Sequence, residues 1–487
     1  MRGAEVLRNP GRVLRNEGGS SWYMCYFLHR LLDFRVPDVE SVISMLGYTL
    51  DLVQWQLPHG NEPFSPFWYL RLPNIELPRL IADRAMLTKG FMEVWGEGST
   101  WEELQESIEA CPAAIKDPWL KEDIKFKIVI ETYGWKLGDE NHKDCIQKLQ
   151  FIPFQGSVDL KHADVKMWLI LCKTSDNSGI PDTVPDRMYF GREVSCSDRS
   201  RVDAYALKKR RYIGPTSMDT EMAFIMANMG KVQKGNMVLD PYAGTGSILV
   251  AAAAFGAQVM GADIDVRVIK VGKLDDQGQQ LDVYSNFQQY SLTPRLAGLL
   301  RMDVHMHSLR PGLEEAFHAI IGDPPYGVRA GGRKSMPKPG IEIRNRENHI
   351  IATAPYTLGE CLRDLLDLAA RLLVVGGRLV YFFPSAPETY REDEIPAHPA
   401  LQLVYNVEQI LTTRYSRRLI VMEKAEKYDA KKASDHHLSL GEPMLSIDRL
   451  HDQVYEQRPG KECTPSVFDK KSNDYQDSTK RFRSKLV

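Results

Sequence analysis

Residues 234–255 read KGNMVLDPYAGTGSILVAAAAF, which is the pattern of a buried strand, a glycine loop and a helix in succession. The apolar run ends in Asp240, and Gly244 and Gly246 follow before a helix of small residues. Glycine lets the backbone approach a ligand closely and turn sharply into a helix N-terminus. The pattern predicts the first β-α unit of a doubly wound α/β domain, in which a nicotinamide cofactor is one possible ligand.

Two further strand ends in the same region carry acids. The strand expected over residues 258–262 is followed by Asp263, and a third strand end lies near Asp303. A carboxylate after the second strand suits the two hydroxyl donors of a ribose, and Asp303 could accept from an adenine amino group. The loop lacks the lysine-bearing cradle that binds polyphosphates. A nucleoside without a polyphosphate fits this pattern, so S-adenosylmethionine is favoured over ATP or NAD.

A second motif, Asp323-Pro324-Pro325-Tyr326, ends the strand expected over residues 316–322. Two prolines fix φ and remove donors, so the chain leaves the strand in a rigid turn with free carbonyls. Asp323 and the Pro324 carbonyl can accept from an exocyclic amine while Tyr326 stacks on the ring. Acceptors on the amine hydrogens push the nitrogen toward sp3 geometry, which methyl transfer to a base nitrogen requires. A proline-rich loop after a buried strand is the plainer interpretation.

The acidic first residue of this motif favours one base. Guanine presents a donor at N1 beside its N2 amine, and a carboxylate such as Asp323 can only accept. Adenine and cytosine place an acceptor beside their amines, and those edges suit an asparagine. The motif therefore favours guanine N2 over adenine N6 or cytosine N4.

Basic residues flank the two motifs. Four consecutive cations beside Tyr212 could meet an RNA backbone, although a solvated surface is the commoner meaning of such a run. A basic, glycine-rich loop at residues 327–334 could form a lid facing the RNA, or a plain surface loop. The cations expected at RNA are Lys208, Lys209, Arg210, Arg211, Arg329 and Arg333.

Thr216 and Ser217 precede a helix expected over residues 219–229. Their hydroxyls and the free N–H groups of the helix could hold the methionine carboxylate of the cofactor, or simply cap the helix. Both roles are compatible.

Composition indicates a large globular protein. The 487 residues carry a formal net charge of −2, so any nucleic-acid surface must be a local patch. Seven scattered cysteines without a C-x-x-C motif argue against disulfides and against a metal site in this chain, and favour a cytoplasmic location. No run of about 18 apolar residues exists, so we expect no membrane span.

The fold class expected is α/β, with a Rossmann-like seven-stranded methyltransferase domain preceded by an α+β region. Strands are expected over 64–70, 124–131, 165–171, 374–383, 401–412 and 418–422, and helices over 38–46, 101–111, 145–149 and 357–373. The boundaries expected are a disordered leader at 1–20, an N-terminal α+β domain at 21–99, a second α+β domain at 100–173, a linker at 174–206, the methyltransferase domain at 207–424 and a disordered polar tail at 425–487.

Taken together, these motifs resemble the catalytic subunit of the tRNA (guanine(10)-N2)-methyltransferase family. The likeness rests on residues 240–246 and 323–329, and on Gly214 to Asp219 after Tyr189-Phe190-Gly191-Arg192. It implies that residues 21–99 form a ferredoxin-like region and residues 100–173 a THUMP RNA-binding domain. It also implies a small zinc-binding activator subunit as partner. The residues it assigns to S-adenosylmethionine are Asp240, Gly244, Gly246, Asp263 and Asp303, and those it assigns to the guanine are Asp323, Pro324 and Tyr326.

The function expected is methylation of N2 of a guanosine in tRNA, with Asp323, Pro324, Pro325 and Tyr326 as the catalytic turn. Two alternatives stay open at this point. One is an N6-adenine or N4-cytosine nucleic-acid methyltransferase, and the other is a non-catalytic scaffold that binds tRNA.

Overall fold

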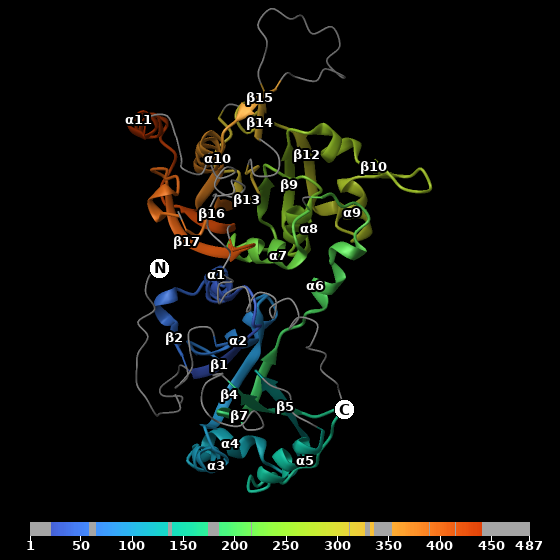
Figure 1. The fold of residues 1–487 in the computed structure, drawn as a ribbon, viewed down its shortest axis with the longest axis vertical. Coiled ribbons are helices and arrows are strands. Elements are labelled where there is room, and N and C mark those ends of the chain that lie inside the picture. Colours follow the sequence, from blue (N-terminus) through green and yellow to red (C-terminus); the bar gives the residue numbers. More distant parts are fainter. Residues whose placement is uncertain are drawn as a thin grey trace, which may run out of the picture. The chain divides into compact units, whose positions relative to one another are not determined.

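The computed structural model shows two compact units, Met1–Ala204 and Tyr205–Val487, each with its own sheet (Figure 1). Its described residues are 21–57, 65–134, 139–173, 185–215, 217–310, 312–326, 332–335, 353–388, 390–413 and 415–440. The leader expected at 1–20 lies outside them.

The first unit is built on one sheet whose described strands have the order β2-β3-β1-β4-β7-β6-β5. Neighbours are antiparallel except β5 and β6, which run parallel. The strands are β1 (Ser21–Phe27), β2 (Gln54–Gln56), β3 (Phe67–Leu72), β4 (Thr88–Gly98), β5 (Phe126–Tyr133), β6 (Val165–Cys172) and β7 (Arg187–Cys196). The helices are α1 (Arg35–Met45), α2 (Leu77–Ala82), α3 (Trp101–Glu109), α4 (Ala113–Lys116), α5 (Asp139–Lys148) and α6 (Ser200–Ala204).

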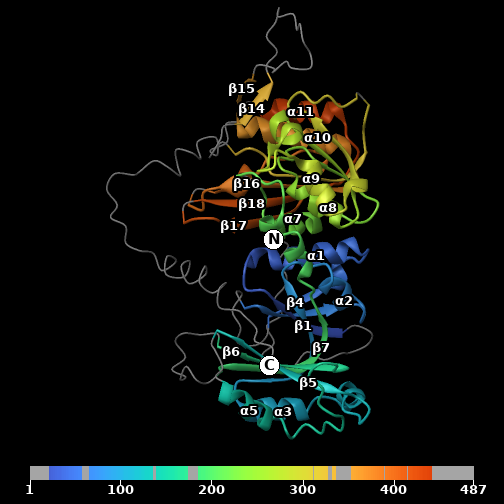
Figure 2. The ribbon, with the colours of Figure 1, turned by 90° about the vertical axis from the view of Figure 1, so that its right-hand side faces the viewer.

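Two apolar cores in this unit correspond to its two halves. Side chains of α1 and α2 pack with β1 and β3, whereas those of α3 and α5 pack with β6 and β7. In Figure 2 the helices α3 and α5 lie beside the part of the sheet that contains β5, β6 and β7. Within β1, Tyr23 and Cys25 belong to the first of these cores while Met24 faces a separate cluster, as alternation along a strand requires. The strands expected in this region and the helices expected over 38–46 and 101–111 are confirmed to within three residues at each end, whereas the helix expected over 145–149 begins earlier, at Asp139.

β7 falls inside the range that the sequence indicated as a linker, residues 174–206. It pairs with β4 from Gly90↔Cys196 to Gly98↔Met188, so one sheet runs through both N-terminal regions. In the sequence this segment resembles a linker, because the residues that pair with its polar side chains lie far away along the chain. Arg192 Nε lies 3.1 Å from Glu93 Oε2, and Arg187 Nη2 lies 3.1 Å from Glu97 Oε2.

The second unit has the Rossmann-like sheet that was expected. Its order is β12-β9-β8-β13-β16-β18-β17, parallel as far as β16 and antiparallel beyond it. The strands are β8 (Met237–Asp240), β9 (Gln258–Asp263), β12 (Leu296–Arg301), β13 (Phe317–Gly322), β16 (Leu373–Ser385), β17 (Leu401–Ile410) and β18 (Ser416–Lys424). Two short hairpins are β10 (Lys273–Leu274) with β11 (Gln280–Leu281), and β14 (Gly332–Ser335) with β15 (Thr353–Tyr356).

Helices cover both faces of this sheet. The five are α7 (Thr220–Met229), α8 (Ser247–Ala254), α9 (Val283–Gln289), α10 (Leu358–Leu372) and α11 (Ala430–Leu440) among the described residues. Ile320 and Ile321 show the two faces, because successive strand residues point to opposite sides. Ile320 belongs to the α10 core, and Ile321 lies under Gly230 at the end of α7.

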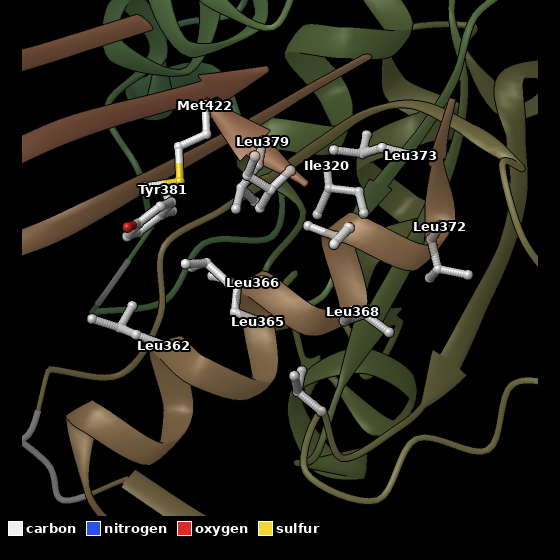
Figure 3. Packing of buried hydrophobic residues seen from close by; sticks show 14 of the residues in the cluster. Ile320, Leu362, Leu365, Leu366, Leu368, Leu372, Leu373, Leu379, Tyr381 and Met422 are labelled. Carbon is white, nitrogen blue, oxygen red and sulfur yellow. The ribbon is translucent and has the colours of Figure 1, made fainter. Parts of the chain in front are cut away.

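The α10 core is the principal apolar cluster of this unit. A capping box formed by Thr357 and Glu360 starts the helix, at the residue where the expected helix began. Leu362, Leu365 and Leu366 then face the sheet, where Tyr381 and Met422 meet them (Figure 3). Burial on one helical stripe holds α10 against the strands whose ends carry the site.

The expectation of a disordered tail from residue 425 is wrong for its first part. Residues 430–440 form α11, in which Ala433 is buried, and the Tyr428 hydroxyl donates to Asp367 at 2.9 Å. The segment is polar enough to suggest disorder, but these few contacts dock it onto α10. Residues 441–487 lie outside the described part of the chain.

Among the described residues, none of the helices combines the length and the apolar character that crossing a bilayer requires.

Replacing Leu365 with alanine should lower the stability of the second unit by about 2–5 kcal/mol, because Leu365 is fully buried. All eight tryptophans lie between Trp22 and Trp168, so tryptophan fluorescence reports on the first unit alone. Hydrogen exchange of peptides from β13 and β16 reports on the second. We expect Leu365→Ala to increase the exchange rate in those peptides, whereas Leu438→Ala, at an exposed position, should change it little. Equal effects of the two variants would contradict this packing.

Candidate active site

Three acidic side chains lie at one edge of the second sheet. β8 ends at Asp240, β9 ends at Asp263, and Asp303 follows β12 by two residues. The three strands are neighbours and parallel, so their carboxyl ends meet, and ligands of open α/β sheets bind at such an edge. The structure thus brings together the acids that the sequence assigned to one ligand.

Asp263 fixes the glycine loop. Its Oδ2 accepts from the Gly244 N–H at 2.9 Å, and its Oδ1 accepts from the Asp265 N–H at 2.8 Å. Gly244 and Gly246 have φ of 49° and 82°, a region that glycine enters without strain. A Cβ on Gly246 would also lie 2.8 Å from Val283 Cγ1. Both glycines are therefore required by the local backbone, and no side chain caps the start of α8.

Asn286 joins a second segment to this loop. It is fully buried, accepts from the Tyr212 N–H at 2.9 Å, and donates to the Tyr212 carbonyl at 2.8 Å and the Thr245 carbonyl at 3.2 Å. Ser217 Oγ lies 2.6 Å from Thr245 Oγ1 and accepts from the Gly214 N–H. Tyr212, Gly214 and Ser217 are therefore tied to the glycine loop, directly or through one another. Sequence reasoning missed Asn286, because no local pattern marks a residue that bridges such distant segments.

Ser217 does not cap α7. Asp219 is the N-cap and accepts from the Met222 N–H at 3.1 Å, whereas Ser217 is engaged with Thr245. Thr216 lies outside the described residues. Of the two roles expected for Ser217, helix capping is thus excluded.

The Asp323 turn contacts the Asp240 loop directly. β13 and β8 are paired, with Ala319 opposite Val238, so their ends lie side by side. A Cβ on Gly322 would lie 3.1 Å from the Tyr242 ring and 3.5 Å from Asp240 Oδ1. The absence of a side chain at Gly322 thus lets the two motifs pack together.

Asp323 has an unusual environment. Its side chain is 25% exposed, its Oδ2 lies 3.6 Å from Arg417 Nη1, and its buried Oδ1 has no hydrogen-bond partner among the described residues. Burial raises the pKa of Asp323 to about 6, and the Arg417 charge opposes that rise. An unpaired acceptor in a buried position costs free energy unless a ligand satisfies it.

The rest of the turn is packed into the protein. Pro324 is buried, and Tyr326 packs against the α10 core with its hydroxyl buried and unpartnered in the described part of the chain. Pro325 lies near β14, because a Cβ on Gly332 would come within 3.6 Å of Pro325 Cγ. The turn is therefore held from both sides.

Arg417 is a site residue that the sequence did not reveal. It lies on β18, its Nε donates to Gln409 Oε1 at 2.7 Å, and its guanidinium lies 3.8 Å from the centre of the Phe382 ring. Burial lowers the pKa of Arg417 and the Asp323 charge raises it. The strand was expected, but its register against β16 was not, and that register places the guanidinium at Asp323.

Asp240 and Asp303 are also enclosed. Burial raises the pKa of Asp240 well above its usual range, the Tyr242 N–H opposes this, and repulsion from Asp263 and Asp323 adds to it. Asp303 accepts from the N–H groups of His305 and of Ser335 in β14. The described residues contain no group of three metal-ligating side chains.

The basic residues divide into exposed and buried members. Lys208, Lys209 and Arg211 are exposed, and so is Arg333 on β14, whereas Arg329 lies outside the described residues. Arg210 is only 6% exposed and donates to Ser247 Oγ at 2.7 Å. The expectation that Arg210 meets RNA is therefore wrong, because its guanidinium is a buried link to the start of α8.

Comparison with known proteins gives matches along most of the chain. The Tmrp11 THUMP N-terminal domain model matches residues 21–199, and the RMKL-like methyltransferase domain model matches residues 208–338. The tRNA (guanine(10)-N(2))-methyltransferases of Pongo abelii and Homo sapiens are each 37% identical over 432 residues, which covers 86% of this chain and 91% of theirs. The protein of that name from Saccharomyces cerevisiae is 33% identical over 415 residues, with 82% and 92% covered.

Asp323→Asn should stabilise the protein at pH 8 and not at pH 4. The pKa of Asp323 rises from about 4 in the unfolded chain to about 6 in the fold. Stability is thus lost as pH rises from about 4 to 6, and above pH 6 the folded state bears the full cost of the buried charge, about 1–3 kcal/mol.

Unfolding measured by hydrogen exchange of the second unit at both pH values checks this. The exposed substitution Asp435→Asn serves as the control and should change stability at neither pH. Destabilisation by Asp323→Asn at pH 8 would show that the carboxylate is a net stabiliser, contrary to its burial.

Proposed function

The chain belongs to the tRNA (guanine(10)-N(2))-methyltransferase family, and from this membership we propose that it methylates N2 of the guanosine at position 10 of tRNA. The relatives carry this activity in their names and align over more than four-fifths of the chain. The enzyme class agrees with the methyltransferase domain model that matches residues 208–338.

The buried, unpartnered Oδ1 of Asp323 is the observation that supports guanine as the base. Guanine offers two neighbouring donors, at N1 and N2, and an ionised carboxylate has acceptor positions for both. Adenine and cytosine would set an acceptor against the same carboxylate. Enclosure of Asp323 also requires the base to be flipped out of its stack to reach it.

The residues at the sheet edge fit S-adenosylmethionine, which supplies an electrophilic methyl group on a sulfonium sulfur. Asp263 lies after the second strand, where a ribose diol is commonly held, and Asp303 lies after the third. Gly244 and Gly246 keep the loop clear of side chains, and the start of α8 has no side-chain cap. Ser217 lies at the same loop through Thr245. The acids at this edge are enclosed, and the glycine loop lacks the lysine that binds polyphosphates in other loops of this kind. These features suit a nucleoside that carries no phosphates.

Asp323 would orient the amine and accept its proton. A carboxylate hydrogen-bonded to N2 increases the electron density on that nitrogen and moves it toward sp3 geometry. A pKa of about 6 leaves Asp323 ionised at neutral pH and still basic enough to receive the proton that N2 loses. Pro324 and Pro325 fix the direction of the turn, so this acceptor needs no reordering when the base arrives.

The RNA contacts proposed divide between the two units. The first unit matches the THUMP model, and we assign the general RNA-binding surface to it. In the second unit the exposed Lys208, Lys209, Arg211 and Arg333 are the candidates for phosphate contacts. Phosphate contacts position an RNA without reading its sequence, and they weaken with salt.

A small zinc-binding activator subunit and a cytoplasmic location complete the proposal. The first follows from the family resemblance. The second is supported by the seven cysteines of the sequence, which are scattered without a C-x-x-C motif, as is usual for proteins of a reducing compartment.

Asp323→Ala should lower single-turnover methylation of unmodified tRNA by more than about 100-fold while leaving tRNA affinity nearly intact, because the carboxylate acts on the amine and not on the RNA backbone. Nucleoside mass spectrometry of the wild-type product should show N2-methylguanosine and map it to position 10. Methylated adenosine or cytidine would instead establish the alternative base.

Asp435→Ala, an exposed acid on α11, is the matched control and should keep wild-type activity. If Asp323→Ala keeps more than about a tenth of the wild-type rate, Asp323 contributes less than about 1.4 kcal/mol and the catalytic assignment fails.

Removing Lys208 and Lys209 together should weaken tRNA binding and reduce its salt dependence, by about one unit of log–log slope for each phosphate that the protein no longer neutralises. The double substitution Lys431→Ala and Lys432→Ala on α11 removes two exposed, adjacent lysines elsewhere and is the control. Filter binding between 50 and 200 mM salt, roughly the range in which such contacts weaken, measures both. Identical slopes for the two double variants would place the phosphate contacts elsewhere.

A further inference from the structure

Asp323 sits beside a cation that does not form a hydrogen bond with it. The shortest distance from the Arg417 guanidinium to the carboxylate is 3.6 Å, from Nη1 to Oδ2. An N–H···O hydrogen bond measures about 2.7–3.2 Å, so this contact is an ion pair without one. Oδ1, the other oxygen, stays buried and unpartnered among the described residues. The charge of Asp323 is thus compensated while its acceptor positions are left unused.

Arg417 is held in this position by groups other than Asp323. Nε donates to Gln409 Oε1 at 2.7 Å, the guanidinium lies 3.8 Å from the centre of the Phe382 ring, and Nη2 lies 3.8 Å from Met218 Sδ. Its side chain is only 14% exposed. A guanidinium fixed on three sides cannot move by about 0.7 Å to close a hydrogen bond without breaking these contacts. The spacing is therefore a property of the surrounding packing.

We propose that Arg417 is a positioning residue for methyl transfer, which holds the Asp323 carboxylate ionised while leaving its oxygens free to accept from the substrate amine. A cation at hydrogen-bond distance would occupy the acceptor that the amine needs. An apolar residue in its place would let the buried carboxyl keep its proton and lose the capacity to accept. The inference rests on the proposed function. It assigns a role to β18, which is antiparallel and carries neither of the two motifs.

Other ionisable groups also face this pair. Asp240, at the end of β8, repels Asp323, so it increases the need for a nearby cation. Asp219, at the start of α7, and Tyr415, before β18, face Arg417. Tyr326 lies on the same turn as Asp323. Among the described residues, Arg417 is the cation whose charge lowers the pKa of Asp323.

The test is the pH dependence of single-turnover methylation, measured between about pH 5.5 and 8.5 with the full chain co-purified with its activator subunit. In the wild type the rate should fall as Asp323 protonates near pH 6. Arg417→Met removes the charge and keeps the length, and should move this midpoint upward by about one unit or more. The loss of rate should then be about fivefold or more at pH 6 and become small at pH 8.5. Arg417→Lys keeps the charge, so its midpoint should lie close to that of the wild type.

Arg418 is the matched control. It is the next residue on β18, lies over the Tyr390 ring at 3.7 Å, and pairs with Glu408 at 3.2 Å instead of with Asp323. Arg418→Met should leave the midpoint in place. If Arg417→Met does not fold, Arg417→Gln, which also removes the charge but keeps polar groups at the end of the side chain, takes its place and should move the midpoint in the same direction.

A loss of rate that is the same at every pH would reduce Arg417 to a structural residue and overturn the inference, as would an equal shift in Arg418→Met. These outcomes are distinct from failure of the proposed function. A wild-type protein that forms no N2-methylguanosine overturns both, whereas an active wild type with an unshifted Arg417→Met profile overturns this inference alone.

Discussion

The pairing of β8 with β13 is the constraint on which the site depends. Because the two strands are parallel and adjacent, the loops that follow them emerge at the same edge, and Gly322 allows them to touch. This contact places the carboxylates of Asp240 and Asp323 in one buried region, where they repel each other. Such an arrangement lowers stability and persists in a fold because other contacts determine the backbone. Here the α10 core and the paired strands supply those contacts.

The antiparallel end of the sheet compensates part of this repulsion. β18 follows β16 in antiparallel register, with Pro384 opposite Arg417 and Ser385 opposite Ser416. That register sets the Arg417 guanidinium over Phe382 and near Asp323. The parallel strands thus carry the ligand-facing acids, and the antiparallel addition carries the cation that balances one of them. The glycine loop is tied separately, through Asp263 and Asn286.

The same division between local and long-range causes explains which expectations held. The strand, loop and helix at residues 237–254 and the α10 helix agree with the structure, because apolar periodicity, glycine and a capping box act within a few residues. β7 resembles a linker in the sequence because its arginines are paired with distant glutamates of β4. Arg210 resembles a surface cation because its partner, Ser247, is also distant in sequence. Polar residues satisfied at long range look the same in a sequence as solvated ones.

The amino-acid sequence by itself predicted the doubly wound domain, the two motifs and the family. It also predicted that an acidic residue in the second motif favours guanine. Each of these depends on which residue types stand at short spacing. Folding in three dimensions decided the rest: that Asp323 keeps one oxygen unpaired, that Arg417 stands 3.6 Å from the other, and that Ser217 serves the glycine loop instead of the helix. Burial and ion pairing depend on which distant segments pack together, and strand register sets that packing. No spacing rule along a chain encodes it.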